Sequence, residues 1–245
     1  GCALFNSMIK QIFDALLYSV FPRRCRLCGQ VVEIDRPICE ECEHNEKIDG
    51  ELCLKCGCLK SDCCCGKSDK KPSYKAVVAP FYYSKGIKRG MHRLKFFGYK
   101  ELAPNIAREM AESVSREYSD IHFDYVTFVP MTKRKLRKRG YNQAELLADA
   151  TAKIINADCL QLLDKIRETE SQRSNSAKAR KTNLYGAFDL HEGADVKGKT
   201  ILLVDDVKTT GSTLNECSEV LKAYGASGVY ACVGAITKLE KRETE

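Results

Sequence analysis

Two adjacent acids followed by a turn rich in hydroxyl groups form the segment of this sequence best suited to bind a phosphorylated sugar. Asp205 and Asp206 follow the apolar run 200–204, whose length and β-branched content are typical of a buried parallel strand. Their carboxylates are placed to accept hydrogen bonds from sugar hydroxyls or to hold a hydrated Mg²⁺ ion. Hydroxyl groups and unpaired backbone N–H groups at a helix start near Ser212 then favour a phosphate. The residues expected to contact it are Thr209, Thr210, Gly211, Ser212 and Thr213.

A strongly basic segment, 133–139, is the second place where the sequence carries binding chemistry. Six of its seven residues are Lys or Arg, and we interpret it as a loop between a strand at 125–129 and a helix at 143–155. Ligands of parallel sheets lie beyond the carboxyl ends of the strands, so a basic loop there is suited to a pyrophosphate. Contact with a nucleic-acid backbone and an ordinary solvated surface are the alternatives. The candidate residues are Thr132, Lys133, Arg134, Arg137 and Arg139, followed by Lys95, Tyr141, Asn142 and Gln143.

The cysteines predict a metal-binding region near the N-terminus. Eleven of the 14 cysteines fall at or before Cys65, which is unlike a disulfide framework spread over a chain. Two CxxC knuckles can direct four thiolates at one Zn²⁺ ion and complete its tetrahedral shell. Such a closed site is structural, and its metal would supply folding energy that a short region does not obtain from packing. The four expected ligands are Cys25, Cys28, Cys39 and Cys42, whereas His44 beside them is expected to be exposed.

A second cysteine set follows and predicts a further zinc site. Another CxxC knuckle precedes a run of three consecutive cysteines, which can supply two more ligands. A redox-active pair is the alternative to a ligand pair. The favoured ligands are Cys53, Cys56, Cys63 and Cys65, with Cys58 and Cys64 left as alternatives.

The composition is that of a globular protein, and no segment has the pattern of a membrane span. The chain is 44% hydrophobic and 30% charged, and its net charge of +7 is compatible with phosphates or nucleic acid as partners. The stretch 8–21 has apolar residues at helical spacing and is expected to form an amphipathic helix that ends at Pro22. This helix either packs on its own protein or contacts a membrane surface or a partner. The clustered cysteines, without a signal-peptide pattern, favour a reducing cytoplasm.

The remaining sequence alternates between strands and helices, which predicts a mostly parallel sheet covered by helices on both faces. A polar, basic stretch before Pro72 indicates a domain boundary. We therefore divide the chain into an amphipathic helix at 1–22, a cysteine-rich zinc module at 23–72 and an α/β domain at 73–245. Strands are expected at 74–83, 125–129, 200–204 and 228–236, and helices at 86–97, 101–118, 143–155 and 212–224.

The acid pair and the turn after it resemble a known binding motif. VDDVKTTGST, 204–213, is similar to the 5-phosphoribosyl 1-pyrophosphate (PRPP) motif of type I phosphoribosyltransferases. In that family the paired acids meet the 2- and 3-hydroxyls of the ribose, and the hydroxyl-rich loop surrounds the 5-phosphate. The resemblance implies the first role for Asp205 and Asp206 and the second for residues 209–213. It also implies a type I phosphoribosyltransferase-like fold, in which Mg²⁺ accompanies PRPP.

Further features extend the resemblance to the ComF family, in which a small zinc-binding region precedes a phosphoribosyltransferase-like domain. They are the segments RGYNQAELLA at 139–148 and LKFFG at 94–98, together with the four-cysteine module. The polar segment 171–188 matches another part of the family pattern. Its matching positions are Gln172, Arg180 and Asn183. The chain departs from the family in its second cysteine set, where ComF proteins often have a CxxC knuckle and this chain has three consecutive cysteines.

ComF proteins are linked to natural competence, the uptake and processing of DNA by bacteria, so the resemblance implies three alternatives. The first is a phosphoribosyltransferase that releases pyrophosphate and uses an acceptor that the sequence does not identify. The second is an accessory protein that works with DNA-uptake proteins and binds single-stranded DNA without catalysis. Basic residues with Phe96, Phe97 and Tyr99 would suit that role. The third is a sensor of PRPP or nucleotides that changes a partner interaction.

Overall fold

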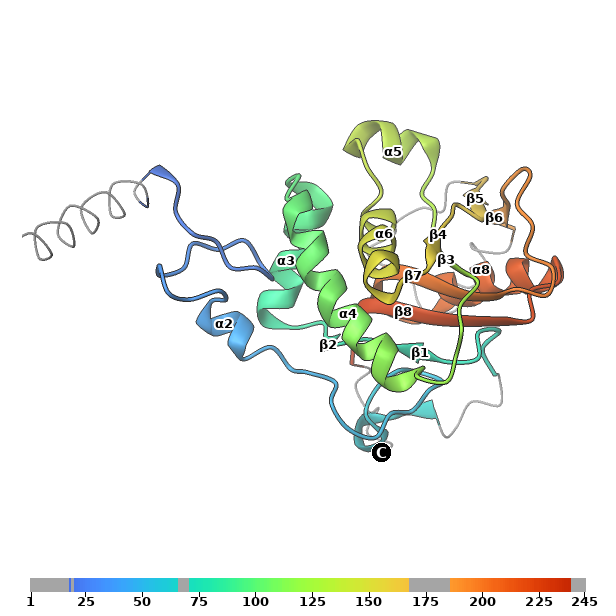
Figure 1. Cartoon of the computed structure of the whole chain (residues 1–245), viewed down its shortest axis with the longest axis horizontal. Coiled ribbons are helices and arrows are strands. Elements are labelled where there is room, and N and C mark those ends of the chain that lie inside the picture. Colours follow the sequence, from blue (N-terminus) through green and yellow to red (C-terminus); the bar gives the residue numbers. More distant parts are fainter. Residues whose placement is uncertain (1–17, 19, 66–70, 168–185, 239–245) are drawn as a thin grey trace, which may run out of the picture.

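The computed structural model describes residues 18, 20–65, 71–167 and 186–238, and its centre is a parallel sheet (Figure 1). The strands of this sheet are β1 (Val77–Val78), β2 (Phe81–Tyr82), β3 (Tyr125–Phe128), β4 (Asp158–Cys159), β7 (Thr200–Lys208) and β8 (Gly228–Ile236). They lie in the order β1-β8-β7-β3-β4, and β2 also pairs with β8. Each of these pairs is parallel, as the alternation of strands and helices predicts.

Helices pack against this sheet through apolar residues at helical spacing. The helices are α2 (Glu40–Glu43), α3 (Lys85–Phe96), α4 (Ala103–Glu117), α5 (Lys133–Arg139), α6 (Gln143–Ile155) and α8 (Ser212–Ala223), with 3-10 turns η1 (Lys60–Asp62) and η3 (Lys100–Leu102). In α4, Ile106, Met110 and Val114 recur every four residues, and all three are buried. α4 packs on α6 and β8, and α6 also covers β3 and β7. α8 packs against β7 and β8. This arrangement leaves the carboxyl ends of β3 and β7 at one edge.

The strand that carries the acid pair is longer than the sequence predicts. The expected strand at 200–204 continues to Lys208 because β8 continues to pair with it, joining Asp205 to Val233 and Lys208 to Ile236. The two acids therefore lie within β7 and do not follow it. Pairing with a neighbouring strand holds polar residues in an extended conformation that their own propensity does not favour.

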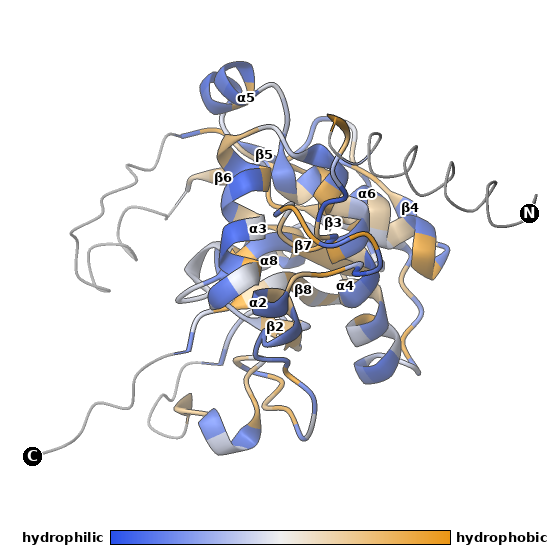
Figure 2. Ribbon diagram, turned by 90° about the vertical axis from the view of Figure 1, so that its left-hand side faces the viewer, coloured by the Kyte–Doolittle hydropathy of each residue, from blue (hydrophilic) through white to orange (hydrophobic). Residues whose placement is uncertain are grey.

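The basic segment 133–139 is helix α5, so its interpretation as a loop is wrong. The side chain of Thr132 accepts a hydrogen bond from the backbone N of Lys135 at 3.4 Å, which is a helix N-cap, and Gly140 follows the last helical residue. Both cap residues are present in the sequence, but the run of basic residues between them favours the interpretation as a loop. Figure 2 shows α5 as a hydrophilic helix at one end of the molecule.

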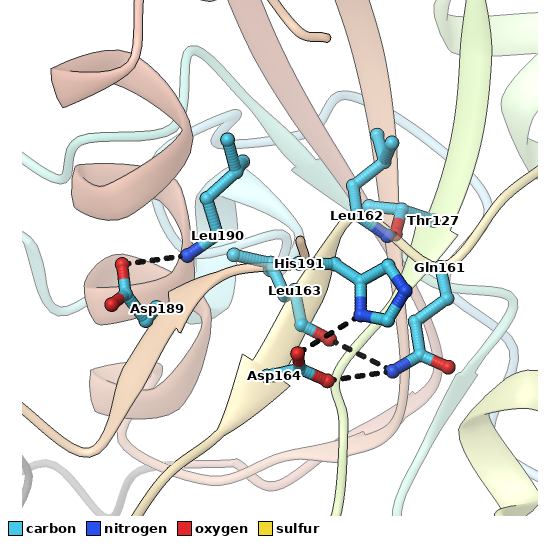
Figure 3. Close-up of polar contacts among 8 residues, drawn as sticks. All are labelled: Thr127, Gln161, Leu162, Leu163, Asp164, Asp189, Leu190 and His191. Atoms are coloured by element: carbon cyan, nitrogen blue, oxygen red, sulfur yellow. Dashed lines mark hydrogen bonds and ion pairs between the residues drawn. The ribbon is translucent and has the colours of Figure 1, made fainter. Parts of the chain in front are cut away.

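A small antiparallel sheet that the sequence does not predict lies beside the main one. It consists of β5 (Leu163–Lys165) and β6 (Phe188–Leu190). The backbone N of Leu162 donates to Oγ1 of the buried Thr127 in β3 at 3.2 Å, and Nδ1 of His191 lies 2.9 Å from Oδ2 of Asp164 (Figure 3). Nε2 of Gln161 also donates to Asp164 at 2.8 Å. The Leu162 contact joins the small sheet to the main sheet close to the carboxyl end of β3, and the two Asp164 contacts hold the small sheet and its flanking residues together.

Some predictions fall outside the described residues. These are most of the amphipathic helix at 8–21 and the positions Gln172, Arg180 and Asn183. No helix among the described residues is long and apolar enough to cross a membrane.

The cysteine-rich region packs directly on the α/β part of the chain. The backbone N of Ile48 donates to the carbonyl O of Pro80 at 2.9 Å, and that of Ile87 donates to Oδ1 of Asn45 at 3.0 Å. Nη1 of Arg93 in α3 reaches the carbonyl O of Cys28 at 2.9 Å. The hydrophobic core also continues into the cysteine-rich region, where it includes the fully buried side chain of Ile48.

Candidate functional site

The acid pair lies near the carboxyl end of β7 and is held by backbone and side-chain hydrogen bonds. Asp206 is buried, and its Oδ2 accepts from Nε2 of Gln143, at the start of α6, at 3.1 Å. Its Oδ1 accepts from the backbone N of Val207 at 2.8 Å, and Oδ1 of Asp205 accepts from the backbone N of Asp206 at 2.8 Å. The Gln143 contact ties the acid pair to α6.

The carboxylate of Asp206 is close enough to disfavour the charged form of Asp205. Burial raises the pKa of Asp205 well above its ordinary value, the charge of Asp206 raises it further, and Lys95 opposes both effects. A cation or sugar hydroxyls at this position would relieve the repulsion. Lys95, a predicted candidate on α3, is therefore near enough to act on the acid pair.

The hydroxyl-rich turn connects β7 to the N-terminus of α8. Thr209 and Thr210 are exposed, and Oγ1 of Thr210 lies 3.0 Å from Oγ of Ser212. Gly211 precedes the first helical residue with a φ of 79°, a conformation that favours glycine. Ser212 and Thr213 form the first turn of α8, where backbone N–H groups lack helical partners. The turn therefore presents hydroxyl and N–H donors to an anion.

The basic helix α5 reaches the acid pair through its last residue. Nη1 of Arg139 donates to Oε1 of Gln143, whose Nε2 donates to Asp206. Thr132 is buried as the N-cap, whereas Lys133, Arg134 and Arg137 are exposed on α5. Of the predicted basic residues, the structure thus brings Arg139 into contact with the network of the acid pair.

Tyr141 and Asn142 fix the backbone between α5 and α6, next to the hydrogen bonds that join Arg139, Gln143 and Asp206. The Tyr141 hydroxyl donates to the carbonyl O of Leu94 in α3. Asn142 caps α6 by accepting from the backbone N of Ala144 at 3.1 Å, and its Nδ2 donates to the carbonyl O of Val129 at 3.0 Å. Both side chains are buried, so they position the chain between α5 and α6.

Two exposed aromatic residues end the α3 region, and the ring of the first, Phe96, lies next to Arg139. The side chains of Phe96 and Phe97 are 59% and 63% exposed, and the ring of His92 lies 4.7 Å from that of Phe96 between centroids. Cζ of Arg139 lies 5.5 Å from the Phe96 ring centroid, and Nζ of Lys95 lies 5.7 Å from it. Apolar rings bordered by cations are therefore continuous with the acid-pair network.

Two charged residues near the acid pair were not predicted from the sequence. Burial lowers the pKa of Lys165 in β5, Lys135 lowers it further, and Asp205 and Glu216 are among the groups that oppose this shift. Glu216 in α8 is buried, its Oε1 accepts from the backbone N of Ala187 at 2.8 Å, and burial raises its pKa. No sequence motif marks either residue, because the β5–β6 hairpin brings Lys165 near α8.

The first cysteine cluster has the geometry of a four-thiolate metal site. The Sγ atoms of its four members lie within 4.8 Å of one another, and those of Cys28 and Cys39 are 3.6 Å apart. A tetrahedral Zn²⁺ site with Zn–S distances of about 2.3 Å separates its sulfur atoms by about 3.8 Å. Hydrogen bonds from Cys28 and Cys42 lower the pKa of Cys25, and hydrogen bonding with Cys25 and Cys28 raises the pKa of Cys42. The members are Cys25, Cys28, Cys39 and Cys42.

The second cysteine cluster has the members that the sequence favours. Its Sγ atoms also lie within 4.8 Å of one another, and those of Cys56 and Cys63 are 3.8 Å apart. Cys58 is buried outside this group, Cys64 is exposed, and Nδ1 of the exposed His44 lies 2.7 Å from the carbonyl O of Glu40. Both clusters could therefore hold a metal ion. The members of the second are Cys53, Cys56, Cys63 and Cys65.

Sequence comparisons relate the chain to proteins of DNA utilization and competence. Residues 139–245 match the phosphoribosyl transferase domain. DNA utilization protein YhgH of Escherichia coli (strain K12) is 31% identical over 216 residues, which cover 85% of this chain and 94% of that protein. Competence protein ComFC of Streptococcus pneumoniae (strain ATCC BAA-255 / R6) is 28% identical over 227 residues, which cover 84% of this chain and 96% of that protein. The similarity to these relatives includes the cysteine-rich region as well as the α/β part.

Among solved structures, the glutamine PRPP amidotransferase from B. subtilis complexed with ADP and GMP matches with a TM-score of 0.40 and 16% identity. The match covers 68% of this chain and 32% of that chain.

Proposed function

Because the chain belongs to the ComF family, we propose that it binds PRPP with Mg²⁺ at the carboxyl edge of its sheet and transfers the ribose 5-phosphate to an acceptor. The observation that carries this proposal is the chain of hydrogen bonds from Asp206 through Gln143 to Arg139. It joins a carboxylate suited to ribose hydroxyls to a cation suited to pyrophosphate through a single side chain, that of Gln143. The hydroxyl-rich turn at 209–213 supplies donors for the 5-phosphate beside them.

Each group in this edge has a role in the proposed reaction. Asp205 and Asp206 accept hydrogen bonds from the 2- and 3-hydroxyls of the ribose and stabilise the positive charge that develops at C1. Arg139 and Lys95, with the exposed cations of α5, stabilise the leaving group. The C1–O bond to pyrophosphate breaks with its electron pair on pyrophosphate, a bond from the acceptor to C1 forms, and the acceptor loses a proton. Mg²⁺, when bound, offsets the charge of the pyrophosphate oxygens.

Two zinc ions are proposed for the cysteine clusters. Four thiolates fill a tetrahedral shell and leave no position for a substrate, so the role of each ion is structural. Clustered thiols remain reduced in a reducing compartment, which supports a cytoplasmic location. The names of the relatives support a role of this chain in bacterial DNA uptake, together with other uptake proteins.

A series of ligands in thermal unfolding tests the proposed binding site. At a hundredfold excess over the dissociation constant, Mg²⁺–PRPP is expected to stabilise the folded protein by about 2.7 kcal/mol. This corresponds to a rise in Tm of about 5–10 °C for a chain of this size. Ribose 5-phosphate, which lacks the pyrophosphate, should raise the Tm less, and unphosphorylated ribose should leave it unchanged. Equal effects of PRPP and ribose would contradict the site.

Single-stranded DNA binding is a second candidate function, favoured by the exposed aromatic rings on α3. The Phe96 ring lies beside Arg139 and Lys95, and Phe97 is exposed next in the chain, an arrangement that suits base stacking with phosphate contact. Tyr99 is less accessible, because the guanidinium groups of Arg93 and Arg24 lie 5.4 and 5.9 Å from its ring centroid.

Replacement of both exposed rings tests this second function. Phe96→Ala with Phe97→Ala is expected to weaken the binding of an oligothymidylate about 5- to 150-fold, which corresponds to about 1–3 kcal/mol of lost stacking. The measurement is fluorescence anisotropy at two salt concentrations, because phosphate contacts make the affinity salt-dependent. Tyr224→Ala, which removes a 51% exposed ring at the end of α8, is the control. Equal affinities of the two variants for the oligonucleotide would exclude α3 as the stacking surface.

A further inference from the structure

We propose that the second cysteine cluster, with its metal bound, positions the phosphate-binding turn through Tyr74 and Lys208. The inference rests on the proposed PRPP site and assigns a positioning role to two residues outside it. Tyr74 precedes β1, and Lys208 is the last residue of β7. Both side chains contact Gly211. Tyr74 also contacts the cysteine-rich region, and Lys208 pairs with Ile236, which packs against that region.

Tyr74 connects the CxxC knuckle of the second cluster to the turn. It is 5% exposed, and its hydroxyl donates to the carbonyl O of Lys55, between Cys53 and Cys56, at 3.0 Å. The same hydroxyl lies 3.3 Å from the position that a Cβ on Gly211 would take. Burial raises the pKa of Tyr74, and nearby thiols led by that of Cys56 raise it further. The ring thus fills the space between the cluster and the turn.

Lys208 makes the second connection. It is only 6% exposed, and its Cε and Nζ lie 3.0 and 3.7 Å from the same Cβ position on Gly211. Lys208 pairs with Ile236 of β8, which packs against Gly57 of the knuckle. A buried ammonium group is stable only near negative charge. Four thiolates around one divalent cation carry a net charge of −2, and a bound phosphate would supply negative charge on the other side.

The knuckle itself is fixed to the sheet, so a change in the cluster is transmitted to the turn. A Cβ on Gly57 would lie 2.5 Å from Cδ1 of Ile236 and 2.9 Å from the carbonyl O of Val77. The backbone N of Val77 donates to the carbonyl O of Leu54 at 2.9 Å. β7 ends beside this contact, because Lys208 pairs with Ile236 in the register of β7 and β8. Metal bound in the cluster therefore holds the knuckle, and the knuckle holds Tyr74 and Lys208 against Gly211.

Reciprocal binding measurements test this coupling. If the metal favours the phosphate-binding arrangement of the turn, PRPP must strengthen zinc binding by the same factor. We expect saturating Mg²⁺–PRPP to lower the zinc dissociation constant of one of the two sites at least tenfold, measured by competition with a zinc-selective chelator. Calorimetry should show PRPP affinity at least tenfold weaker in Cys53→Ser. Tyr74→Phe and Lys208→Met should retain both zinc ions and reduce the coupling factor.

Matched controls separate positioning from general damage. Tyr224→Phe removes a hydroxyl that donates to Oδ1 of Asp189 at 3.0 Å, and Lys199→Met removes an ammonium group just before the opposite end of β7. Both should retain the coupling of the wild type. Wild-type protein that binds PRPP with no change in zinc affinity would overturn the inference and leave the proposed function intact. Failure of the zinc-loaded wild type to bind PRPP would instead refute the proposed function. Chelator competition on the wild type measures the coupling even where Cys53→Ser does not fold.

Discussion

Replacement of Asp205 and Asp206 by Asn is expected to weaken Mg²⁺–PRPP binding at least about 5- to 150-fold, which corresponds to a total of about 1–3 kcal/mol, the typical cost of one lost charged hydrogen bond. Asn keeps the shape of each side chain, but it removes the charge that faces the ribose hydroxyls and the cation. The measurement is calorimetric titration of Mg²⁺–PRPP into the double variant. Asp149→Asn, at an exposed position on α6 that pairs with Lys153, is the matched control and should bind as the wild type does.

The same double variant is expected to be more stable than the wild type in the absence of ligand. Because burial and the charge of Asp206 raise the pKa of Asp205, the folded protein holds the proton of this carboxyl more tightly than the unfolded chain. Stability therefore falls as the pH rises from about 3.9, the ordinary value for Asp, through the raised folded pKa. Asn has no carboxyl to ionise, so the variant does not lose this stability at neutral pH. PRPP binding by the double variant as tight as that of the wild type would refute the role of the acids. If the variant lost binding because it unfolds, its Tm would be lower than that of the wild type.

The other large effect is expected from the first cysteine cluster. Cys28→Ser should lower the zinc content from two equivalents to one and reduce the Tm sharply, because structural Zn²⁺ contributes roughly 10–16 kcal/mol in small zinc-dependent folds. The loss should spread to α3, since Arg93 donates to the carbonyl O of Cys28 and Asn45 accepts from the backbone of Ile87. Zinc analysis, thermal unfolding and hydrogen exchange of α3 measure these three effects.

Cys64→Ser is the control for the loss of zinc. Cys64 is exposed and is not a member of either cluster, so this variant should keep both zinc ions and the Tm of the wild type. Retention of two zinc equivalents by Cys28→Ser would contradict the assignment of the first site.

The residues that carry local signals were predictable from the sequence. Knuckle spacing identified the first cysteine cluster and the Cys53–Cys56 half of the second, because the cysteines of a knuckle are close in sequence. The spacing does not select two of the three consecutive cysteines, and the structure groups the favoured pair, Cys63 and Cys65, with that half. The helix at 143–155 and the strand at 228–236 have the predicted bounds. Pro80 divides the expected strand at 74–83 into β1 and β2, as a missing backbone donor requires.

Features that depend on distant partners were not predictable. β7 extends beyond Val204 because β8 pairs with it, and β4, β5 and β6 are too short to show a periodicity of their own. Lys165 comes near the acid pair and Glu216 only through the pairing of β5 with β6. Lys208 lies inside the recognised motif, but the approach of Tyr74 to the same position on Gly211 joins residues that are distant in sequence. Helix α5, in contrast, could have been predicted from its local sequence, because Thr132 and Gly140 are typical cap residues. The run of basic residues instead led to its interpretation as a loop.

The most direct test of the central claim is calorimetric titration of Mg²⁺–PRPP into zinc-loaded protein, with pyrophosphate release followed in the same samples. The proposed site predicts saturable binding of one PRPP per chain, lost in the Asp205→Asn, Asp206→Asn variant and retained in Asp149→Asn. Release of pyrophosphate would establish the transfer chemistry and justify a search for the acceptor. Binding without release would favour a sensor of PRPP. Absence of binding to protein that carries both zinc ions would contradict the claim and leave DNA binding by α3 and α5 as the function to test.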